Sequence, residues 1–221
     1  MKQYGIVVID DHAIFIQGLS LLIDSERDFS VTGSATNSAD AKILIEEKKP
    51  DIAIIDLNLG DEDGLELIKA LAEKHPDLKL LVLSMLQERY YAERCLVAGA
   101  RGYVMKDSAA DTLISAMRSV LAGKIWLSDT EQKRYIDARF VSRAPASNKQ
   151  NPLEILSDRQ LQVFRMLGRG HSTIEIAEIL SISTKTVDSH KELLKKKLNC
   201  ASAQELLKMA ISWNKNTVSE P

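Results

Sequence analysis

Hydrophobic and polar residues follow two different periods along the first half of the chain. Short, almost uninterrupted apolar runs alternate with segments in which apolar residues recur at helical spacing. The apolar runs predict five strands, at residues 5–10, 29–35, 51–56, 78–84 and 101–105. The segments that follow them predict five helices, at residues 13–24, 38–49, 64–75, 88–99 and 111–123. The pattern therefore predicts five strand–helix units in succession.

Strands that are apolar throughout and joined by helices are typical of a parallel sheet covered by helices on both faces. Right-handed crossovers leave few ways to connect such a sheet. In open sheets of this kind, ligands bind at the carboxyl ends of the strands. The fold class expected for the first half is therefore α/β, with a five-stranded parallel sheet and candidate chemistry at one edge.

The second half of the chain lacks this strand pattern. Residues 128–152 are polar and end with Pro, Ser and Asn, which predicts a linker that has room for a helix over residues 131–141. Beyond the linker, the pattern predicts four short helices, at residues 157–170, 172–183, 184–198 and 202–213. We therefore expect an α/β domain over residues 1–127, a linker over 128–152 and an all-α domain over 153–215.

The composition narrows the class of protein. With 45% hydrophobic residues, the chain can bury proper cores. No apolar run approaches the roughly 18 residues of a membrane span, and the N-terminus lacks the pattern of a secretory signal peptide. Cys95 and Cys200 lie far apart without metal-ligand spacing, as expected for free thiols in a reducing compartment. We expect a cytoplasmic protein with no membrane segment.

The net charge of −2 conceals an uneven distribution. Residues 1–127 contain 14 Lys/Arg and 20 Asp/Glu, a balance of −6. Residues 152–215 contain 10 Lys/Arg and 7 Asp/Glu, a balance of +3. Such a division favours two domains with different partners, and an anion is the expected partner of the second.

Polar side chains follow the ends of four predicted strands: Asp10, Asp11, Asp56, Ser84 and Lys106. Three carboxylates at one edge of a sheet repel one another unless a cation joins them, and carboxylate oxygens suit Mg²⁺. A lysine and a hydroxyl beside the metal would bind the remaining oxygens of a phosphoryl group, which an aspartate can attack as a nucleophile. Each residue alone is more simply explained by turn formation, but together they predict a phosphoryl-transfer site.

Four motifs at these strand ends resemble the receiver domain of bacterial two-component response regulators: VVIDDH (7–12), IIDLNLGDEDG (54–64), VLSM (82–85) and GYVMKDS (102–108). The resemblance covers about the first 125 residues and implies a flavodoxin-like fold. It implies that Asp56 is the phosphoacceptor and that Lys106 and Ser84 contact the phosphoryl group. It also implies that Mg²⁺ is bound by Asp10, Asp11, Asp56 and the backbone carbonyl of Asn58.

Three further residues near this site have two interpretations. Tyr103 resembles the aromatic residue that is coupled to the hydroxyl in this family, although an aromatic side chain in an edge strand is equally explained by packing. Gly60 stands where the family usually has proline, and the preserved spacing from Asp56 to Gly64 predicts a looser loop around an intact site. His12, beside the acidic pair, has an interpretation as a ligand or base, but it is expected instead to begin the first helix and to point away from the acids.

Residues 172–198 predict a helix, a short turn and a second helix, which is the spacing of a helix-turn-helix motif. Ile174, Ala177 and Leu180 are expected to face a core shared with the second helix. In this motif the second helix enters the major groove, with its N-terminal residues nearest the base edges. Lysines along that helix would contact phosphates and make binding depend on salt.

The segment 156–199 resembles the LuxR-type DNA-binding domain, in features that include EIA (175–177), KTV (185–187) and KKL (196–198). Together with the first domain, it resembles the NarL/FixJ family of response regulators. The residues expected to face DNA lie on the second helix of the motif: Thr184, Lys185, Thr186, Asp188, Ser189, Lys191, Glu192 and Lys195. Asp188 and Glu192 stand where relatives often have neutral or basic residues, and at least one of them is expected to point away or to pair with a lysine.

The resemblance implies a DNA-binding transcriptional regulator rather than an enzyme. A sensor histidine kinase or a small phosphodonor would phosphorylate Asp56, which would promote homodimerisation, release of the DNA-binding domain, or both. The last helix supplies an apolar face for pairing two copies on promoter DNA. Two alternatives remain open: a metal-dependent phosphohydrolase that uses Asp56 as its nucleophile, and a regulator that needs no phosphorylation and whose first domain serves only for dimerisation.

Overall fold

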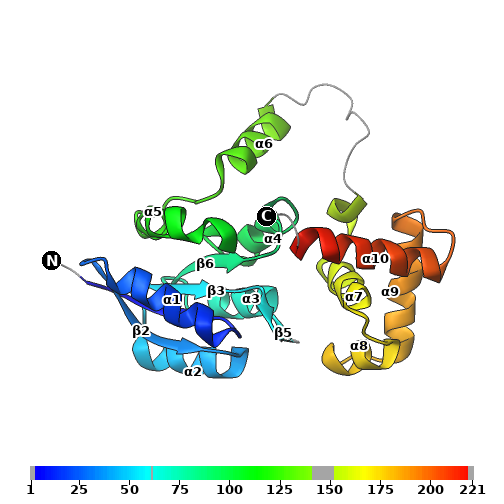
Figure 1. The fold of residues 1–221 in the computed structure, drawn as a ribbon, viewed down its shortest axis with the longest axis horizontal. Coiled ribbons are helices and arrows are strands. Elements are labelled where there is room, and N and C mark those ends of the chain that lie inside the picture. Colours follow the sequence, from blue (N-terminus) through cyan, green and yellow to red (C-terminus); the bar gives the residue numbers. More distant parts are fainter. Residues whose placement is uncertain (1–2, 61, 141–151, 219–221) are drawn as a thin grey trace. The chain divides into compact units, whose positions relative to one another are not determined.

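The computed structural model describes residues 3–60, 62–140 and 152–218 and contains two compact units, Met1–Arg139 and Phe140–Pro221 (Figure 1). The first unit is an α/β domain and the second is helical, as the sequence predicts. Asp61 and most of the polar end of the predicted linker lie outside the described residues. No helix in the described part of the chain is long and apolar enough to cross a membrane.

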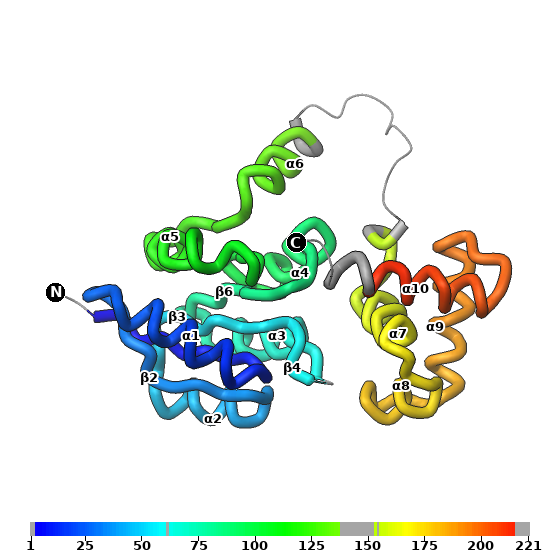
Figure 2. Tube along the Cα trace, viewed as in Figure 1, coloured from blue at the N-terminus to red at the C-terminus, as the bar shows by residue number. Residues whose placement is uncertain are grey.

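The first unit contains a five-stranded parallel sheet with the order β2-β1-β3-β6-β7. Its strands are β1 (Tyr4–Ile9), β2 (Phe29–Ala35), β3 (Ile52–Ile55), β6 (Lys79–Ser84) and β7 (Gly102–Met105). The helices that alternate with them are α1 (Ala13–Asp24), α2 (Ser38–Lys48), α3 (Gly64–Lys74), α4 (Glu88–Ala98) and α5 (Ala109–Leu121). Figure 2 follows this alternation along the tube from blue to green. The predicted flavodoxin-like fold is confirmed.

Burial on both faces explains why the strands are apolar throughout. On one face, Leu19 of α1 and Leu113 and Met117 of α5 pack in one core with residues of β1, β3, β6 and β7. On the other face, α3 lies beside both α2 and α4. The central strand, Ile52–Ile55, is at most 1% exposed. Full burial of such a side chain contributes about 1.5–3 kcal/mol, so the sheet holds the residues at its edge on a rigid base.

Two features of the first unit follow from contacts that the sequence pattern does not specify. The segment after β3 forms an antiparallel hairpin of β4 (Asn58–Leu59) and β5 (Glu62–Asp63), where the sequence predicts a loop. The predicted linker begins with a helix, α6 (Asp129–Phe140). Just before it, the Ser128 N–H donates to the carboxylate of Glu88 in α4 at 2.8 Å. Arg134 of α6 donates to the Arg89 carbonyl at 3.2 Å. The start of the linker is therefore attached to α4.

The second unit consists of η2 (Pro152–Ile155), α7 (Asp158–Arg169), α8 (Thr173–Ile179), α9 (Thr184–Lys197) and α10 (Ala203–Val218). Ser157, Ser172 and Ser183 cap the N-termini of α7, α8 and α9, because each hydroxyl accepts a backbone N–H three residues later. Gly170 ends α7 in the left-handed region, at φ +92°. These caps fix the lengths of the helices and the tight turns between them.

The expectation that Ile174 faces the core of this unit is wrong. Ile174 is 62% exposed, whereas Ile176 is fully buried and Ala177 and Leu180 are at most 9% exposed. Since successive residues turn by about 100° around a helix, Ile174 lies on the opposite side of α8 from Ile176. The buried face of α8 packs against α9, in which Val187 is fully buried.

Candidate functional site

The carboxyl ends of β1, β3 and β6, with η1 (Lys106–Ser108) after β7, surround an acidic pocket. Ile9 pairs with Ile55 across β1 and β3, so Asp10 and Asp56 leave the sheet side by side. Their exposed fractions are 2% and 3%. Burial raises the pKa of Asp56 above its ordinary value, although Lys106 partly opposes the rise. A carboxylate is thus held out of water at the position where the sequence predicts a nucleophile.

Donors from three elements hold the Asp56 carboxylate. Its Oδ1 accepts from the Ser84 hydroxyl at 2.8 Å and from the Asn58 backbone N–H at 3.1 Å. Its Oδ2 accepts from Lys106 Nζ at 2.6 Å, and the same Nζ lies 2.5 Å from Asp10 Oδ2. Burial lowers the pKa of Lys106, but the two carboxylates outweigh this and raise it above its ordinary value. The lysine therefore places one positive charge between the two buried acids.

Asp11 is tied to the hairpin that follows Asp56. The backbone N–H of Gly60 donates to Asp11 Oδ2 at 2.9 Å, and Gly60 has φ +63°, in the left-handed region. A proline at this position has no N–H to donate and cannot adopt a positive φ. The glycine thus supplies a specific contact to the acidic pair, and the looser loop that the sequence predicts stays a prediction.

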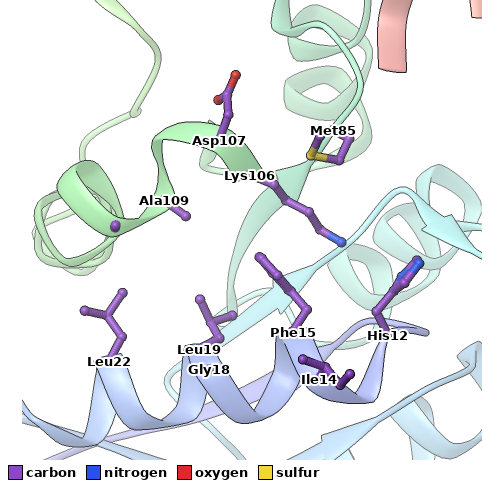
Figure 3. Close-up of a pocket in the computed structure, with 11 residues that line it drawn as sticks. His12, Ile14, Phe15, Gly18, Leu19, Leu22, Met85, Lys106, Asp107 and Ala109 are labelled. Carbon is purple, nitrogen blue, oxygen red and sulfur yellow. The ribbon is translucent and has the colours of Figure 1, made fainter. Parts of the chain in front are cut away.

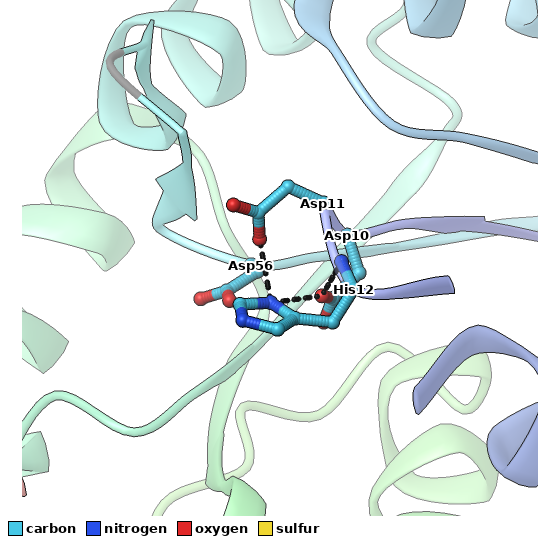
Figure 4. A group of neighbouring side chains, drawn as sticks. All are labelled: Asp10, Asp11, His12 and Asp56. Atoms are coloured by element: carbon cyan, nitrogen blue, oxygen red, sulfur yellow. Dashed lines mark hydrogen bonds and ion pairs between the residues drawn. The ribbon is translucent and has the colours of Figure 1, made fainter. Parts of the chain in front are cut away.

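His12 turns toward the acids, which corrects the expectation that it points away. Its Nδ1 lies 2.7 Å from Asp11 Oδ1 and 3.3 Å from Asp10 Oδ1 (Figure 4). Its backbone N–H donates to Asp10 Oδ1 at 2.9 Å, a turn that directs the ring back over the pocket. The contiguous DDH sequence was a signal for this contact, but the direction of the side chain depends on that turn.

The residues of the pocket fit the Mg²⁺ that the family implies. One ligand atom from each of Asp10, Asp11, His12 and Asp56 lies within 4.8 Å of the others. Three carboxylates from two strand ends provide the oxygen ligands that a hard divalent ion prefers. Asn58, two residues after Asp56, begins β4, and its backbone N–H donates to the Asp56 carboxylate.

The hydroxyl of Ser84 and the ring of Tyr103 meet at the segment between β6 and α4. Ser84 is fully buried, and its Oγ accepts from the Leu86 backbone N–H at 3.4 Å. Tyr103 is 1% exposed, and its hydroxyl donates to the Leu86 carbonyl at 2.6 Å. Burial raises the pKa of Tyr103 well above its ordinary value, so the hydroxyl remains a donor. Both residues therefore hold Leu86, just before α4.

An apolar cavity of about 750 Å³ lies beside the acidic pocket, between α1 and the start of α5. Figure 3 shows Phe15, Leu19 and Leu22 of α1 pointing toward this space, with Lys106 on its other side. The Lys106 ammonium lies 4.4 Å from the centre of the Phe15 ring. Ile14, which also lines the cavity, is 85% exposed. An apolar surface open to solvent therefore lies next to the acidic pocket.

The residues predicted to face DNA lie along α9. The exposed members are Thr184, Lys185, Asp188, Ser189 and Glu192, and the half-buried members are Thr186, Lys191 and Lys195. Both acids pair with lysines of the same helix, as expected for at least one of them. Asp188 lies 3.5 Å from Lys191, and Glu192 lies 2.8 Å from Lys195.

Two lysines of α9 also contact neighbouring elements. Lys191 donates to the Thr173 hydroxyl at 3.0 Å. Lys197 donates to the Ile155 carbonyl and to Gln160, each at 2.8 Å. Lys197 therefore joins α9 to η2 and α7, a structural contact that helical spacing alone does not reveal.

The fold and the pocket together define a receiver-type α/β domain that is joined to a helix-turn-helix domain. Comparison with family models agrees: residues 6–118 match the response regulator receiver domain, and residues 154–210 match the luxR family of bacterial regulatory proteins. The chain belongs to the NarL/FixJ family of two-component response regulators, a family of DNA-binding transcription regulators.

Curated relatives match nearly the whole chain. The oxygen regulatory protein NreC of Staphylococcus epidermidis is 33% identical over 210 residues, which cover 93% of this chain and 96% of the relative. NreC of Staphylococcus carnosus is 34% identical over 209 residues, with the same coverage.

Solved structures share the fold. RcsB of Salmonella enterica serovar Typhimurium, bound to promoter rprA in the presence of the phosphomimetic BeF3⁻, aligns over 95% of this chain and 99% of that chain. The TM-score is 0.74 at 23% identity, a likeness of fold alone. A LuxR-family response regulator from Aurantimonas aligns over 62% of this chain and 99% of that chain, with a TM-score of 0.59 and 29% identity.

Proposed function

We propose that this protein is a transcription factor controlled by phosphorylation of Asp56, with a sensor histidine kinase as phosphodonor. One observation carries the proposal. Asp56 is buried at the sheet edge, with Lys106 on one carboxylate oxygen and the Ser84 hydroxyl on the other. If Asp56 were only an ion-paired structural residue, it would not need Asp10 and Asp11 beside it. A phosphoacceptor that works with Mg²⁺ does need such acids to bind the ion.

The transfer uses groups that already meet at Asp56. A carboxylate oxygen of Asp56 attacks phosphorus, a P–O bond forms, and the bond from phosphorus to the donor breaks, with the electron pair leaving on the donor. The Lys106 ammonium group then forms an ion pair with the phosphoryl oxygens, and the Ser84 hydroxyl donates a hydrogen bond to one of them. Asp10, Asp11, Asp56 and the Asn58 carbonyl would hold Mg²⁺, which would supply charge neutralisation for the transfer.

Phosphorylation of Asp56 changes the conformation of α4 through the contacts of Leu86. If Ser84 moves toward the phosphoryl group, its contact with the Leu86 N–H is lost, and Tyr103 remains bonded to the Leu86 carbonyl. The segment before α4 then has two arrangements, which phosphorylation biases. Since Glu88 at the start of α4 accepts from the Ser128 N–H, the change extends to α6 and to the linker.

DNA is the partner of the second unit, through α9 in the major groove. Lys185 and Ser189 lie one turn apart on the exposed side of α9, with Thr184 and Thr186 nearer the DNA backbone. Leu207 and Ile211 of α10 are 39% and 36% exposed, and they give a second copy an apolar surface on which to pair. Two copies on adjacent half-sites offset the modest charge of one.

Incubation of the full chain with acetyl phosphate and Mg²⁺ tests the proposal. Intact-protein mass spectrometry should detect one added phosphoryl group on the wild type, because a small donor reaches the pocket without a kinase. Asp56→Asn and the metal-free wild type should show no gain. Continuous release of phosphate over many turnovers would favour a phosphohydrolase instead, and no gain with a purified kinase as donor would overturn phosphoryl control.

Neutralising the acids of α9 should strengthen binding to duplex DNA. In the double variant Asp188→Asn/Glu192→Gln, Lys191 and Lys195 lose the acids with which they pair, so Lys195 becomes available to phosphates and Lys191 keeps only its neutral partner, the Thr173 hydroxyl. The slope of log K against log salt should steepen by about 0.9 for each phosphate gained. Fluorescence anisotropy with a random-sequence duplex measures this slope. Glu178→Gln, which removes one negative charge from α8, is the control; an effect half as large there, in proportion to its single charge, would mean that net charge alone matters.

A further inference from the structure

His12 occupies an unusual place for a residue at the start of a helix. It is the N-cap of α1, yet its side chain makes no capping hydrogen bond. The side chain is 67% exposed, but its Nδ1 lies between the carboxylates of Asp10 and Asp11 rather than in solvent. An imidazole nitrogen thus approaches a site in which the other candidate ligand atoms are carboxylate oxygens.

Protein donors occupy the positions around these carboxylates. Asp10 Oδ2 contacts Lys106, and Asp10 Oδ1 accepts from the His12 backbone. Asp11 Oδ2 accepts from Gly60, and Asp11 Oδ1 contacts the His12 imidazole. Lys106 and the His12 ring are therefore the side chains that contact the carboxylates of Asp10 and Asp11. A bound divalent ion would take over these contacts.

The imidazole differs from the lysine in one respect that matters for a metal. An ammonium group has donors only, whereas a neutral imidazole has one N–H and one lone pair. With the proton on Nε2, the lone pair of Nδ1 points toward the carboxylates of Asp10 and Asp11, which lie 3.3 and 2.7 Å from Nδ1. The same ring position that contacts the carboxylate can then bind an ion held by Asp10, Asp11 and Asp56.

We propose that His12 is a nitrogen ligand which extends this site from Mg²⁺ to first-row transition ions such as Mn²⁺, Co²⁺ and Zn²⁺. The inference rests on the metal site of the proposed function and deepens it. Imidazole nitrogen suits Zn²⁺ and its neighbours, while Mg²⁺ is satisfied by oxygen and water. Since the ring is largely exposed, it can leave the ion when Mg²⁺ binds, and His12 therefore sets the preference between the two kinds of ion.

Pulsed electron paramagnetic resonance of the full chain loaded with Mn²⁺ tests the ligand directly. A coupling to nitrogen is expected in the wild type, and labelling with ¹⁵N-histidine should change it to the pattern of ¹⁵N. His12→Asn should abolish this coupling. His75→Asn, at the end of α3 in the same unit, should retain it and controls for nonspecific binding by exposed histidine.

Calorimetric titration with Mn²⁺, Zn²⁺ and Mg²⁺ gives the second readout. The ratio of Mn²⁺ to Mg²⁺ affinity should fall at least about tenfold in His12→Asn, since loss of even a hydrogen-bond partner of a metal ligand typically costs that much. Bound Mn²⁺ without histidine coupling, or an unchanged ratio, would overturn the inference and leave His12 as a partner of Asp11 alone. Phosphorylation of the wild type by acetyl phosphate with Mg²⁺ is a separate measurement, so failure of the proposed function and failure of this inference are distinguishable.

Discussion

Replacement of Lys106 by methionine should lower the free energy of unfolding of the receiver unit by about 3 kcal/mol at neutral pH in metal-free buffer. The side chain is 7% exposed, and its ammonium lies between Asp10 and Asp56. Methionine keeps most of the packing on Phe15 but removes the charge, so two buried carboxylates are left to repel each other. Urea denaturation, followed by circular dichroism, measures the change.

The loss should depend on pH with a definite sign. The pKa of Asp56 is already raised by burial, above an ordinary value of 3.8, and removal of Lys106 raises it further. A carboxyl group with a raised pKa in the folded state favours folding when it is protonated, and this stability is lost as the pH rises through that pKa. The difference between variant and wild type should therefore be small in acid and largest at neutral pH.

Added Mg²⁺ should restore part of the stability of Lys106→Met, because an ion that binds the folded state alone stabilises it. The wild type should gain less, since its lysine competes for the same carboxylates. Lys69→Met is the matched control: Lys69 pairs with Glu66 on the surface, 2.9 Å away, and such pairs contribute at most about 1 kcal/mol. Equal losses in the two variants would contradict the role of Lys106 as the neutralising cation.

The sequence predicts the strand ends of this pocket well because they depend on the sheet. A parallel sheet with apolar strands must bring the residues after β1, β3 and β6 to one edge, so Asp10, Asp56 and Ser84 could be grouped without coordinates. The contact of Ser84 with Asp56 at 2.8 Å agrees with this grouping. Periodicity sufficed here because backbone topology, rather than side-chain choice, decides the result.

Side-chain direction in short segments could not be predicted in the same way. His12 points at the acids because its own backbone N–H bonds Asp10 and turns the chain, a local choice that no period encodes. The hairpin after Asp56 has strands of two residues, too short for an alternating pattern. On α9, the sequence places Lys197 among the lysines expected to contact phosphates. Its contacts with Ile155 and Gln160 arise instead from the packing of three elements, which helical spacing does not specify.

Gly64→Ala should destabilise the receiver unit by about 3 kcal/mol, although alanine is the better helix former. Gly64 begins α3 and lies outside the left-handed region, so its backbone conformation suits any residue. Space is the obstacle. A Cβ at this position would lie 2.4 Å from the carbonyl oxygen of Asp56 and 2.6 Å from the Leu57 Cα. Both are backbone atoms, which cannot rotate away as a flexible side chain would, and such overpacking typically costs about 1–3 kcal/mol.

The same clash should reach Asp56, the proposed phosphoacceptor. The Gly64 N–H donates to the Leu57 carbonyl at 3.2 Å and closes the segment that leaves Asp56, so displacement of α3 moves the carboxylate away from Lys106 and Ser84. The rate of mass gain with acetyl phosphate and Mg²⁺ should therefore fall together with stability. Gly18→Ala is the control in the same unit, since Gly18 lies within α1 with open space around its Cβ position. That change should raise stability by up to about 1 kcal/mol and leave the rate unaltered. A Gly64→Ala variant that is as stable as the wild type and is phosphorylated as fast would show that the chain relaxes around the added methyl group, and that the spacing from Asp56 to Gly64 does not position the acceptor.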